Sequence, residues 1–152
     1  MGLMIDLQPS AGAALVVGGG RIAARKVTNL AAGGFRVVVI APAICEEIAG
    51  VGVEGQRRAF AASDLTFEQG YAVVFACTND RAVNRFVGEL ARVRGIPVVV
   101  ADAAGESTFF TPAVARHEGV SVAVSTGGAS PRRARDLRDQ IVAALGDGWG
   151  AQ

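Results

Sequence analysis

The chain has 152 residues, a formal net charge of +1 and a hydrophobic content of 51%. This composition excludes a disordered chain, which needs few apolar residues and a high net charge, and the near-neutral charge gives no reason to expect nucleic-acid binding. The longest apolar runs are far shorter than the ~20 residues of a membrane span, and no cleavable leader is recognisable at the start. We therefore expect a cytoplasmic protein of one domain, or of one domain with a short appendage.

Short apolar runs alternate with amphipathic stretches along the first two thirds of the chain. The runs predict strands, and because they lack polar alternation they are typical of parallel strands that are covered on both faces. The strands are predicted at 13–17, 35–40, 71–77 and 96–101, with a weaker edge strand at 51–59. The helices between them are predicted at 22–32, 42–49 and 80–94. This order predicts an α/β fold with a Rossmann-like parallel sheet and helices on both faces.

The pattern changes near residue 103. Two short runs, at 107–110 and 120–124, predict further strands. A helix is predicted from Pro131 to about residue 145, because Ser130 is a favourable N-cap and proline fits the first helical turn. This second piece is too small to fold alone, so we expect it to pack on the first piece or on a second subunit. The predicted domains are a Rossmann domain at 1–103 and a short β/α segment at 104–152.

Histidine and cysteine, the residues that most often bind zinc, are rare in this sequence. Cys45 and Cys77 lie in apolar surroundings, which is typical of buried free thiols rather than of a disulfide. The single histidine, His117, follows an expected helical turn and is interpreted as a surface polar group, with assistance to a substrate as the alternative. Because no Cys/His cluster is present, we predict no metal site.

A glycine-rich turn at residues 18–23, Gly-Gly-Gly-Arg-Ile-Ala, lies between a predicted strand and a predicted helix. It fits the pattern G-x-G-x-x-G/A, in which Gly18 allows a tight turn, Gly20 lets a pyrophosphate approach the backbone, and Ala23 lets the helix pack closely on the strand. The free amides and the positive dipole end of the helix attract phosphates. We predict a dinucleotide site here; the alternative is a glycine-rich turn without a ligand.

The ends of the second and third core strands extend this predicted site. The second strand ends at Ile40 and Ala41, without the acidic residue that usually binds the ribose and without a cation for a 2′-phosphate, so the motif does not separate NAD from NADP. Thr78 and Asn79 end the third strand and should face the other half of the cofactor, with ordinary turn chemistry as the alternative. The predicted cofactor-binding residues are Gly18, Gly20, Arg21, Ile22, Ala23, Ile40, Ala41, Thr78 and Asn79.

Five motifs follow one another between residues 3 and 145. They are the glycine-rich turn with Arg25 and Lys26, the strand end at 76–80 with Asn84 after it, the run 98–102, the stretch 107–112, and the segment 124–131 with Ala134 and Arg135. In this order they resemble the precorrin-2 dehydrogenase and sirohydrochlorin ferrochelatase family, the N-terminal module of siroheme synthases. The resemblance implies a homodimer and the NAD-dependent oxidation of precorrin-2 to sirohydrochlorin in siroheme or cobalamin synthesis.

By this resemblance Asp102 is the catalytic base. It ends a core strand at the sheet edge that carries the ligand crevice, where a carboxylate can take a proton as hydride leaves the substrate. From the residue alone, a loop aspartate that caps a turn is an equal interpretation. Precorrin-2 is a polycarboxylate, which suits the basic helix start near residue 130, although a solvated charged face is the alternative. The predicted substrate-binding residues are Ser125, Thr126, Gly127, Gly128, Ser130 and Arg132.

Two alternative functions stay open. Some members of the family also insert iron, and Asp102 could supply the base for metal insertion. A non-enzymatic NAD(H)-binding regulatory module is the other alternative, but it needs neither Asp102 nor the segment 127–131. Relatives usually continue into a further helical region and, in fused enzymes, a methyltransferase module. We expect a stand-alone dehydrogenase with a shortened C-terminal segment, whose substrate site a partner chain completes.

Overall fold

The computed structural model describes residues 2–146 and 150–151. The chain forms two compact units, one of Ile5–Phe109 and one of Met1–Met4 with Phe110–Gln152. Residues 104–109, which were predicted in the second segment, belong to the first of these units. No helix within the described residues is long and apolar enough to cross a membrane.

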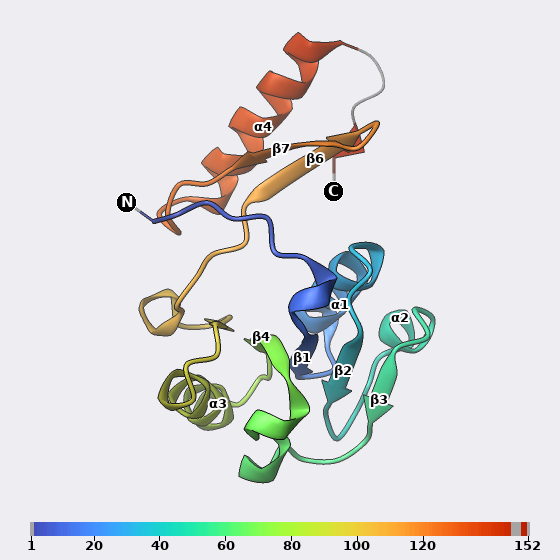
Figure 1. Ribbon diagram of the computed structural model, residues 1–152, viewed down its shortest axis with the longest axis vertical. Helices are drawn as coiled ribbons and strands as arrows, with labels where there is room; N and C mark the ends of the chain where they lie inside the picture. The colour runs from blue at the N-terminus through green and yellow to red at the C-terminus, as the bar shows by residue number, and fades with distance from the viewer. Residues whose placement is uncertain (1, 147–149, 152) are drawn as a thin grey trace. The chain divides into compact units, whose positions relative to one another are not determined.

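Five parallel strands form the sheet of the first unit (Figure 1). They are β1 (Ala13–Val17), β2 (Val37–Ile40), β3 (Glu54–Gln56), β4 (Tyr71–Ala76) and β5 (Val98–Val100). Their order across the sheet is β3-β2-β1-β4-β5, and every neighbouring pair is parallel. The order reverses between β1 and β4, which creates the topological switch point at which Rossmann-like folds bind their ligands. The predicted fold class is confirmed.

Helices cover both faces of this sheet. They are α1 (Arg21–Ala32), α2 (Glu46–Ala49) and α3 (Arg81–Val93), with 3-10 turns at Pro9–Ala11, Ala62–Asp64, Phe67–Gln69 and Ala104–Glu106. Successive side chains of a strand point to opposite faces, and β1 is buried along its whole length. Val16 packs in the cluster that contains Val27 of α1, whereas Leu15 packs in the cluster that contains Val87 of α3. The continuous apolar run of β1 therefore contributes side chains to the hydrophobic cores on both faces of the sheet.

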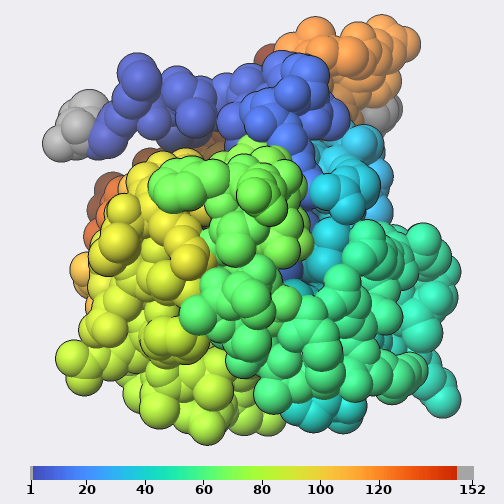
Figure 2. Space-filling model, turned by 60° about the horizontal axis from the view of Figure 1, so that its bottom comes forward, coloured from blue at the N-terminus to red at the C-terminus, as the bar shows by residue number. Residues whose placement is uncertain are grey.

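The connection from β3 to β4 contains no long helix. Its Leu65 is fully buried in the core on the α3 side, and Phe60 packs edge to face on Phe86 with ring centroids 6.0 Å apart. Figure 2 shows this connection in green, between the teal region of α2 and β3 and the yellow-green region of α3. Arg58 and Asp64 brace it, because two guanidinium nitrogens lie 2.5 and 2.6 Å from the two carboxylate oxygens.

The second unit is a β-hairpin with one helix. It contains β6 (Ala113–His117), β7 (Val120–Val124), α4 (Pro131–Leu145) and β8 (Gly150–Ala151), which pairs with β6. Glu118 and Gly119 have positive φ angles of 47° and 80°, as a tight two-residue hairpin turn requires. The start of α4 is confirmed, because the Ser130 hydroxyl accepts a hydrogen bond from a first-turn amide at 3.2 Å. Buried Arg138 donates to the carbonyl of Val114 at 3.3 Å and so ties α4 to the hairpin.

Residues 107–110 do not form the predicted strand. Ser107 and Thr108 lie beside β5 in a loop, and the Ser107 hydroxyl accepts a hydrogen bond from the amide of Val100 at 2.9 Å. The Thr108 hydroxyl accepts one from the amide of Val98 at 2.8 Å. Side-chain oxygens therefore satisfy the outer edge of the sheet where another strand would otherwise pair.

Two further local predictions are wrong. The helix predicted at 42–49 begins only at Glu46, because the Cys45 amide donates to the Gly19 carbonyl at 2.9 Å and Cys45 itself is extended. No helical turn precedes His117, which instead ends β6 opposite Val120. In the first case a partner distant in sequence overrides a local preference, and in the second case the pairing of β6 with the neighbouring strand β7 does so.

Candidate functional site: a cofactor cleft and a strand-end carboxylate

The glycine-rich turn connects β1 to α1, and its glycines have different reasons to lack a side chain. Gly18 has a φ of +126°, and a Cβ there would lie 2.4 Å from the carbonyl oxygen of Cys77. A Cβ on Gly19 would lie 1.9 Å from the carbonyl oxygen of Ala43. A Cβ on Gly20 would meet no atom within 4 Å. Packing therefore requires the first two glycines, whereas the space beside Gly20 is open to a ligand.

The start of α1 borders this open space. Gly20 is the N-cap of α1 and supplies no side chain to cap the first-turn amides, which leaves them to an anion. Arg21 and Ile22 are exposed on the first turn and, with Arg25, line a hollow of 490 Å³. Ala23 is fully buried, so its small side chain serves the packing of α1 on the sheet.

A cleft of 440 Å³ lies where β1, β2 and β4 end. Three loops line it, with residues Gly18, Gly19, Gly20, Ala41, Pro42, Ala43, Ile44, Cys45, Cys77, Thr78 and Asn79. The Gly18 amide donates to the Ile40 carbonyl at 3.0 Å, which joins the first loop to the second strand. Ile40 itself is only 1% exposed and packs in the core, so Ala41 is the residue of this pair that lines the cleft. The structure thus brings most of the predicted cofactor residues together.

Asn84 fixes the third of these loops, and its role was not predicted. Its side chain is fully buried on α3. The Oδ1 atom accepts from the amide of Thr78 at 2.9 Å and lies 2.7 Å from its hydroxyl, while Nδ2 donates to its carbonyl at 3.0 Å. The sequence offered one signal for this role, namely an amide on the otherwise apolar inner face of a helix. Both backbone groups of Thr78 are therefore hydrogen-bonded to α3, which anchors this loop to the helix.

Cys77 lines the cleft, and its thiol has a raised pKa. Burial raises the pKa of the Cys77 thiol to about 11, the cations Lys26 and Arg25 oppose this, and the charge of Asp102 adds to it. Lys26 is half-buried with a lowered pKa, also because of burial, and its Nζ lies 5.4 Å from the ring centroid of Phe75. The thiol is therefore protonated near neutral pH, and Asp102 lies close enough for its charge to reach the cleft wall.

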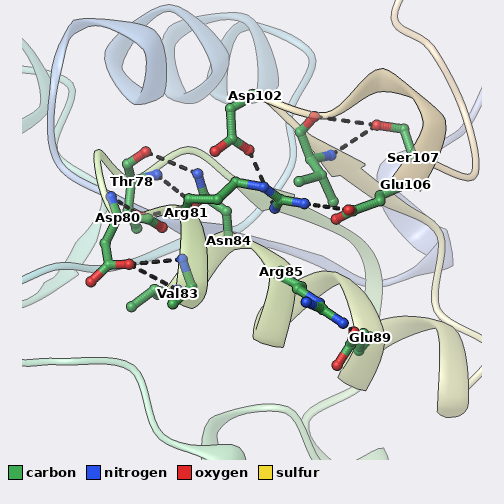
Figure 3. A network of polar contacts seen from close by, with 12 residues as sticks. Thr78, Asp80, Arg81, Val83, Asn84, Arg85, Glu89, Asp102, Glu106 and Ser107 are labelled. Atoms are coloured by element: carbon green, nitrogen blue, oxygen red, sulfur yellow. Dashed lines mark hydrogen bonds and ion pairs between the residues drawn. The ribbon is translucent and has the colours of Figure 1, made fainter.

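Asp102 follows β5 at the same edge of the sheet as the cleft loops (Figure 3). Its side chain is 37% exposed, so a substrate can reach it. One carboxylate oxygen lies 3.8 Å from Nη1 of Arg81, and Nη2 of Arg81 pairs with Glu106. Arg92 donates to the backbone carbonyl of Glu106 at 2.6 Å. Arg81 and Glu106 were not predicted as site residues, because nothing local in their segments marks them as partners.

The predicted substrate residues lie in the second unit, in the turn before α4 and in its first residues. The Thr126 hydroxyl lies 3.0 Å from both the amide and the carbonyl of Ser130, and the Ser125 hydroxyl accepts from the amide of Gly127 at 3.1 Å. Gly128 has a φ of +82°, and a Cβ there would lie 2.6 Å from the Phe110 ring. Arg132 is exposed and reaches Asp136 at 4.0 Å. The hydroxyls of Ser125, Thr126 and Ser130 are therefore already hydrogen-bonded within the turn and the start of α4. The side chain of Arg132 is 88% exposed.

The sheet order, the open Gly20 and the cleft at the switch point define a dinucleotide-binding protein. Residues 3–113 match the family described as "Putative NAD(P)-binding", and residues 118–144 match "Sirohaem biosynthesis protein central". The chain belongs to this NAD(P)-binding family. The resemblance to the N-terminal module of siroheme synthases is confirmed.

Individual relatives agree with this assignment. The chain is 40% identical over 142 residues to a siroheme synthase of Thioalkalivibrio sulfidiphilus, which covers 91% of this chain and 28% of the relative. It is 42% identical over 140 residues to a siroheme synthase of Methylococcus capsulatus, which covers 90% of this chain and 29% of the relative. The solved structure of "SirC, precorrin-2 dehydrogenase" superposes with a TM-score of 0.72 at 28% identity, over 95% of this chain and 70% of that one. The chain thus spans less than a third of the curated relatives.

Proposed function

We propose that the chain is an NAD-dependent dehydrogenase that oxidises precorrin-2 to sirohydrochlorin, with Asp102 as the general base. The observation that carries this proposal is an accessible carboxylate at the end of β5, on the sheet edge that also holds the glycine-rich cleft. The similarity to a solved precorrin-2 dehydrogenase supports the substrate. The siroheme synthase relatives support a place in siroheme synthesis.

The residues of the cleft fit a nicotinamide dinucleotide. The space above Gly20 admits a pyrophosphate, and the uncapped amides at the start of α1 can donate to it. Thr78 and Asn79 line the opposite part of the cleft, where small polar groups can bond to the second half of the cofactor. When bound, the nicotinamide supplies the acceptor for a hydride.

The reaction needs one base from the chain. Precorrin-2 loses a hydride to NAD⁺ and a proton to Asp102, which yields sirohydrochlorin and NADH, and Asp102 then releases its proton to water. The side chain of Asp102 is partly exposed, which allows this return of the proton to solvent. Cys77 does not take part as a nucleophile, since burial raises the pKa of its thiol to about 11.

We propose NAD⁺ rather than NADP⁺ as the oxidant. The loop after β2 lines the cleft with Ala41, Pro42, Ala43, Ile44 and Cys45, and none of these carries a cation for a 2′-phosphate. We expect kcat/KM to be at least ~10-fold higher with NAD⁺, since a buried or crowded phosphate without a partner costs ~1.4 kcal/mol or more. Equal kcat/KM values for the two cofactors would contradict this part.

We also propose that α4 contributes to a homodimer. Leu137, Ile141 and Leu145 follow one another at helical spacing and are 36%, 40% and 51% exposed. An apolar stripe of this kind is typical of a contact surface. Light scattering on the purified protein should give twice the monomer mass, and Ile141→Asp should shift the protein toward the monomer. A monomeric wild type would contradict this part.

The central experiment is to incubate the purified protein with precorrin-2 and NAD⁺ and to follow the sirohydrochlorin spectrum. Wild-type protein should form sirohydrochlorin and NADH in equal amounts. Asp102→Asn should lower kcat by ~10²- to 10⁴-fold while NAD⁺ binding is kept. If the wild type produces no spectral change, the dehydrogenase proposal fails and the NAD(H)-binding module is the function that is left. If Asp102→Asn turns over precorrin-2 as fast as the wild type, Asp102 is not the base. Metal insertion is tested separately, by incubating sirohydrochlorin with the protein and Fe²⁺ or Co²⁺.

A further inference from the structure

Arg81 lies between two carboxylates at the end of β5 (Figure 3). We infer that Arg81 is a positioning residue, which holds the Asp102 carboxylate for proton transfer and is itself fixed by Glu106. This inference rests on the proposed function, because it takes Asp102 as the base. It assigns roles to two residues that the sequence did not single out.

The backbone of Arg81 is fixed by the start of α3. The preceding residue, Asp80, is the N-cap, and its carboxylate accepts from the amides of Ala82 at 2.8 Å and Val83 at 3.3 Å. Arg81 is therefore anchored as the first residue of the helix. Its long side chain leaves the helix toward the loop that follows β5, where Figure 3 shows the guanidinium between Asp102 and Glu106.

Glu106 is the stronger of the two partners of Arg81. Its Oε1 atom pairs with Nη2 of the guanidinium, whereas the Asp102 oxygen lies 3.8 Å from Nη1. The backbone of Glu106 is held by Arg92, which donates to its carbonyl at 2.6 Å, and the next residue, Ser107, is bonded to β5. The second carboxylate oxygen of Glu106 is buried and has no hydrogen-bond partner among the described residues. Arg81 is thus the cation that pairs directly with the Glu106 carboxylate, while Arg85 acts on that carboxylate only through its charge.

This arrangement leaves one side of Asp102 free for chemistry. Oδ1 faces Arg81, and Oδ2 has no hydrogen-bond partner in the described part of the chain. The guanidinium orients the carboxylate through one oxygen, so the other can accept the proton from the substrate. Without Arg81, the carboxylates of Asp102 and Glu106 would repel each other, and Asp102 would turn toward solvent.

The test compares five variants with the wild type, and one of them, Arg81→Gly, leaves room for an added guanidinium ion. Arg81→Gln removes the positive charge, and Arg81→Lys keeps the charge but not the planar guanidinium. Glu106→Gln removes the carboxylate charge that pairs with Arg81. Arg85→Gln is the matched control, because Arg85 lies one turn further along α3 and pairs with Glu89 at 2.9 Å on an exposed face. For each, kcat, KM for both substrates, NAD⁺ binding and thermal unfolding are measured.

Arg81→Gln should lower kcat by ~10- to 100-fold, the usual effect of a misplaced catalytic group, with KM for NAD⁺ within ~2-fold of wild type. Glu106→Gln should lower kcat by a smaller factor, and Arg81→Lys should recover part of the loss. Arg85→Gln should behave as wild type. Guanidinium ion added at millimolar concentration should raise kcat of Arg81→Gly but not of Asp102→Asn, an effect that a purely structural role would not produce.

The inference is overturned if Arg81→Gln and wild type share the same kcat, if Arg85→Gln loses as much activity, or if guanidinium gives no rescue. It is also overturned if Arg81→Gln raises only KM for precorrin-2, because Arg81 would then bind a substrate carboxylate. A wild-type protein without turnover overturns the proposed function and this inference with it. If the wild type is active and Arg81→Gln is equally active, this inference is overturned and the proposed function stands.

Discussion

Gly20→Ala should separate cofactor binding from folding. A Cβ at this position would meet no atom of the chain within 4 Å, and the φ of −93° suits alanine. Alanine is a poorer N-cap than glycine by ~0.5–1 kcal/mol, but it also restricts the unfolded chain by ~0.4–1 kcal/mol. These terms nearly cancel, so the free energy of unfolding should stay within ~1 kcal/mol of wild type.

The same methyl group should weaken the dinucleotide site. It occupies the space through which a pyrophosphate reaches the first-turn amides of α1, whose N-cap is Gly20. The loss of one hydrogen bond to a charged group, ~1.5–3 kcal/mol, raises the dissociation constant for NAD⁺ or NADH by ~10- to 100-fold. Isothermal titration measures this constant, and thermal unfolding in the absence of ligand measures the stability.

Gly19→Ala is the matched comparison. Its Cβ would lie 1.9 Å from the carbonyl oxygen of Ala43, so two loops must move and the protein should lose ~1–3 kcal/mol of stability. The two neighbouring alanine substitutions should thus differ in kind, since Gly20→Ala affects the ligand and Gly19→Ala affects the fold. NADH binding by Gly20→Ala at wild-type strength would refute the assignment of this turn to the pyrophosphate.

Three further predictions concern buried polar groups. Asn84→Ala leaves the amide and carbonyl of Thr78 without partners, so it should cost ~1–3 kcal/mol and lower Tm by several degrees; an unchanged Tm in thermal unfolding would contradict it. The Arg58 guanidinium, aided by a backbone amide and opposed by partial burial, lowers the pKa of Asp64. The stability from Asp64 is therefore present above the unfolded-state pKa of ~3.9 and lost as pH falls through the lower folded-state value. Urea unfolding should show wild type more stable than Asp64→Asn at pH ~7, with the difference shrinking below pH ~4; a difference independent of pH would contradict this. Because burial raises the pKa of Cys77 to about 11, iodoacetamide at pH ~8 should modify this residue only after unfolding. Fast labelling of Cys77 in the folded protein would contradict the buried, protonated thiol.

The main architecture followed from the sequence because it depends on local patterns. Continuous apolar runs such as 13–17 and 71–77 indicated strands buried on both faces, and these became the central β1 and β4. The segment 107–110, with two hydroxyl residues before two phenylalanines, was also predicted as a strand but forms a loop, because its hydroxyls accept hydrogen bonds from the edge of β5. Which hydroxyl meets which edge depends on the assembled sheet and has no signature in the local sequence.

The candidate site divides in the same way. The glycine-rich turn and the position of Asp102 after a strand could be predicted, because both are read from a strand followed by a short characteristic segment. The pairing of Arg81 with Glu106, 25 residues further along the chain, and their position beside Asp102 depend on the folded chain and could not be predicted. Parallel strands bring their carboxyl ends to one edge, and the side chains that meet there are selected by sheet order and helix packing, which no local pattern records.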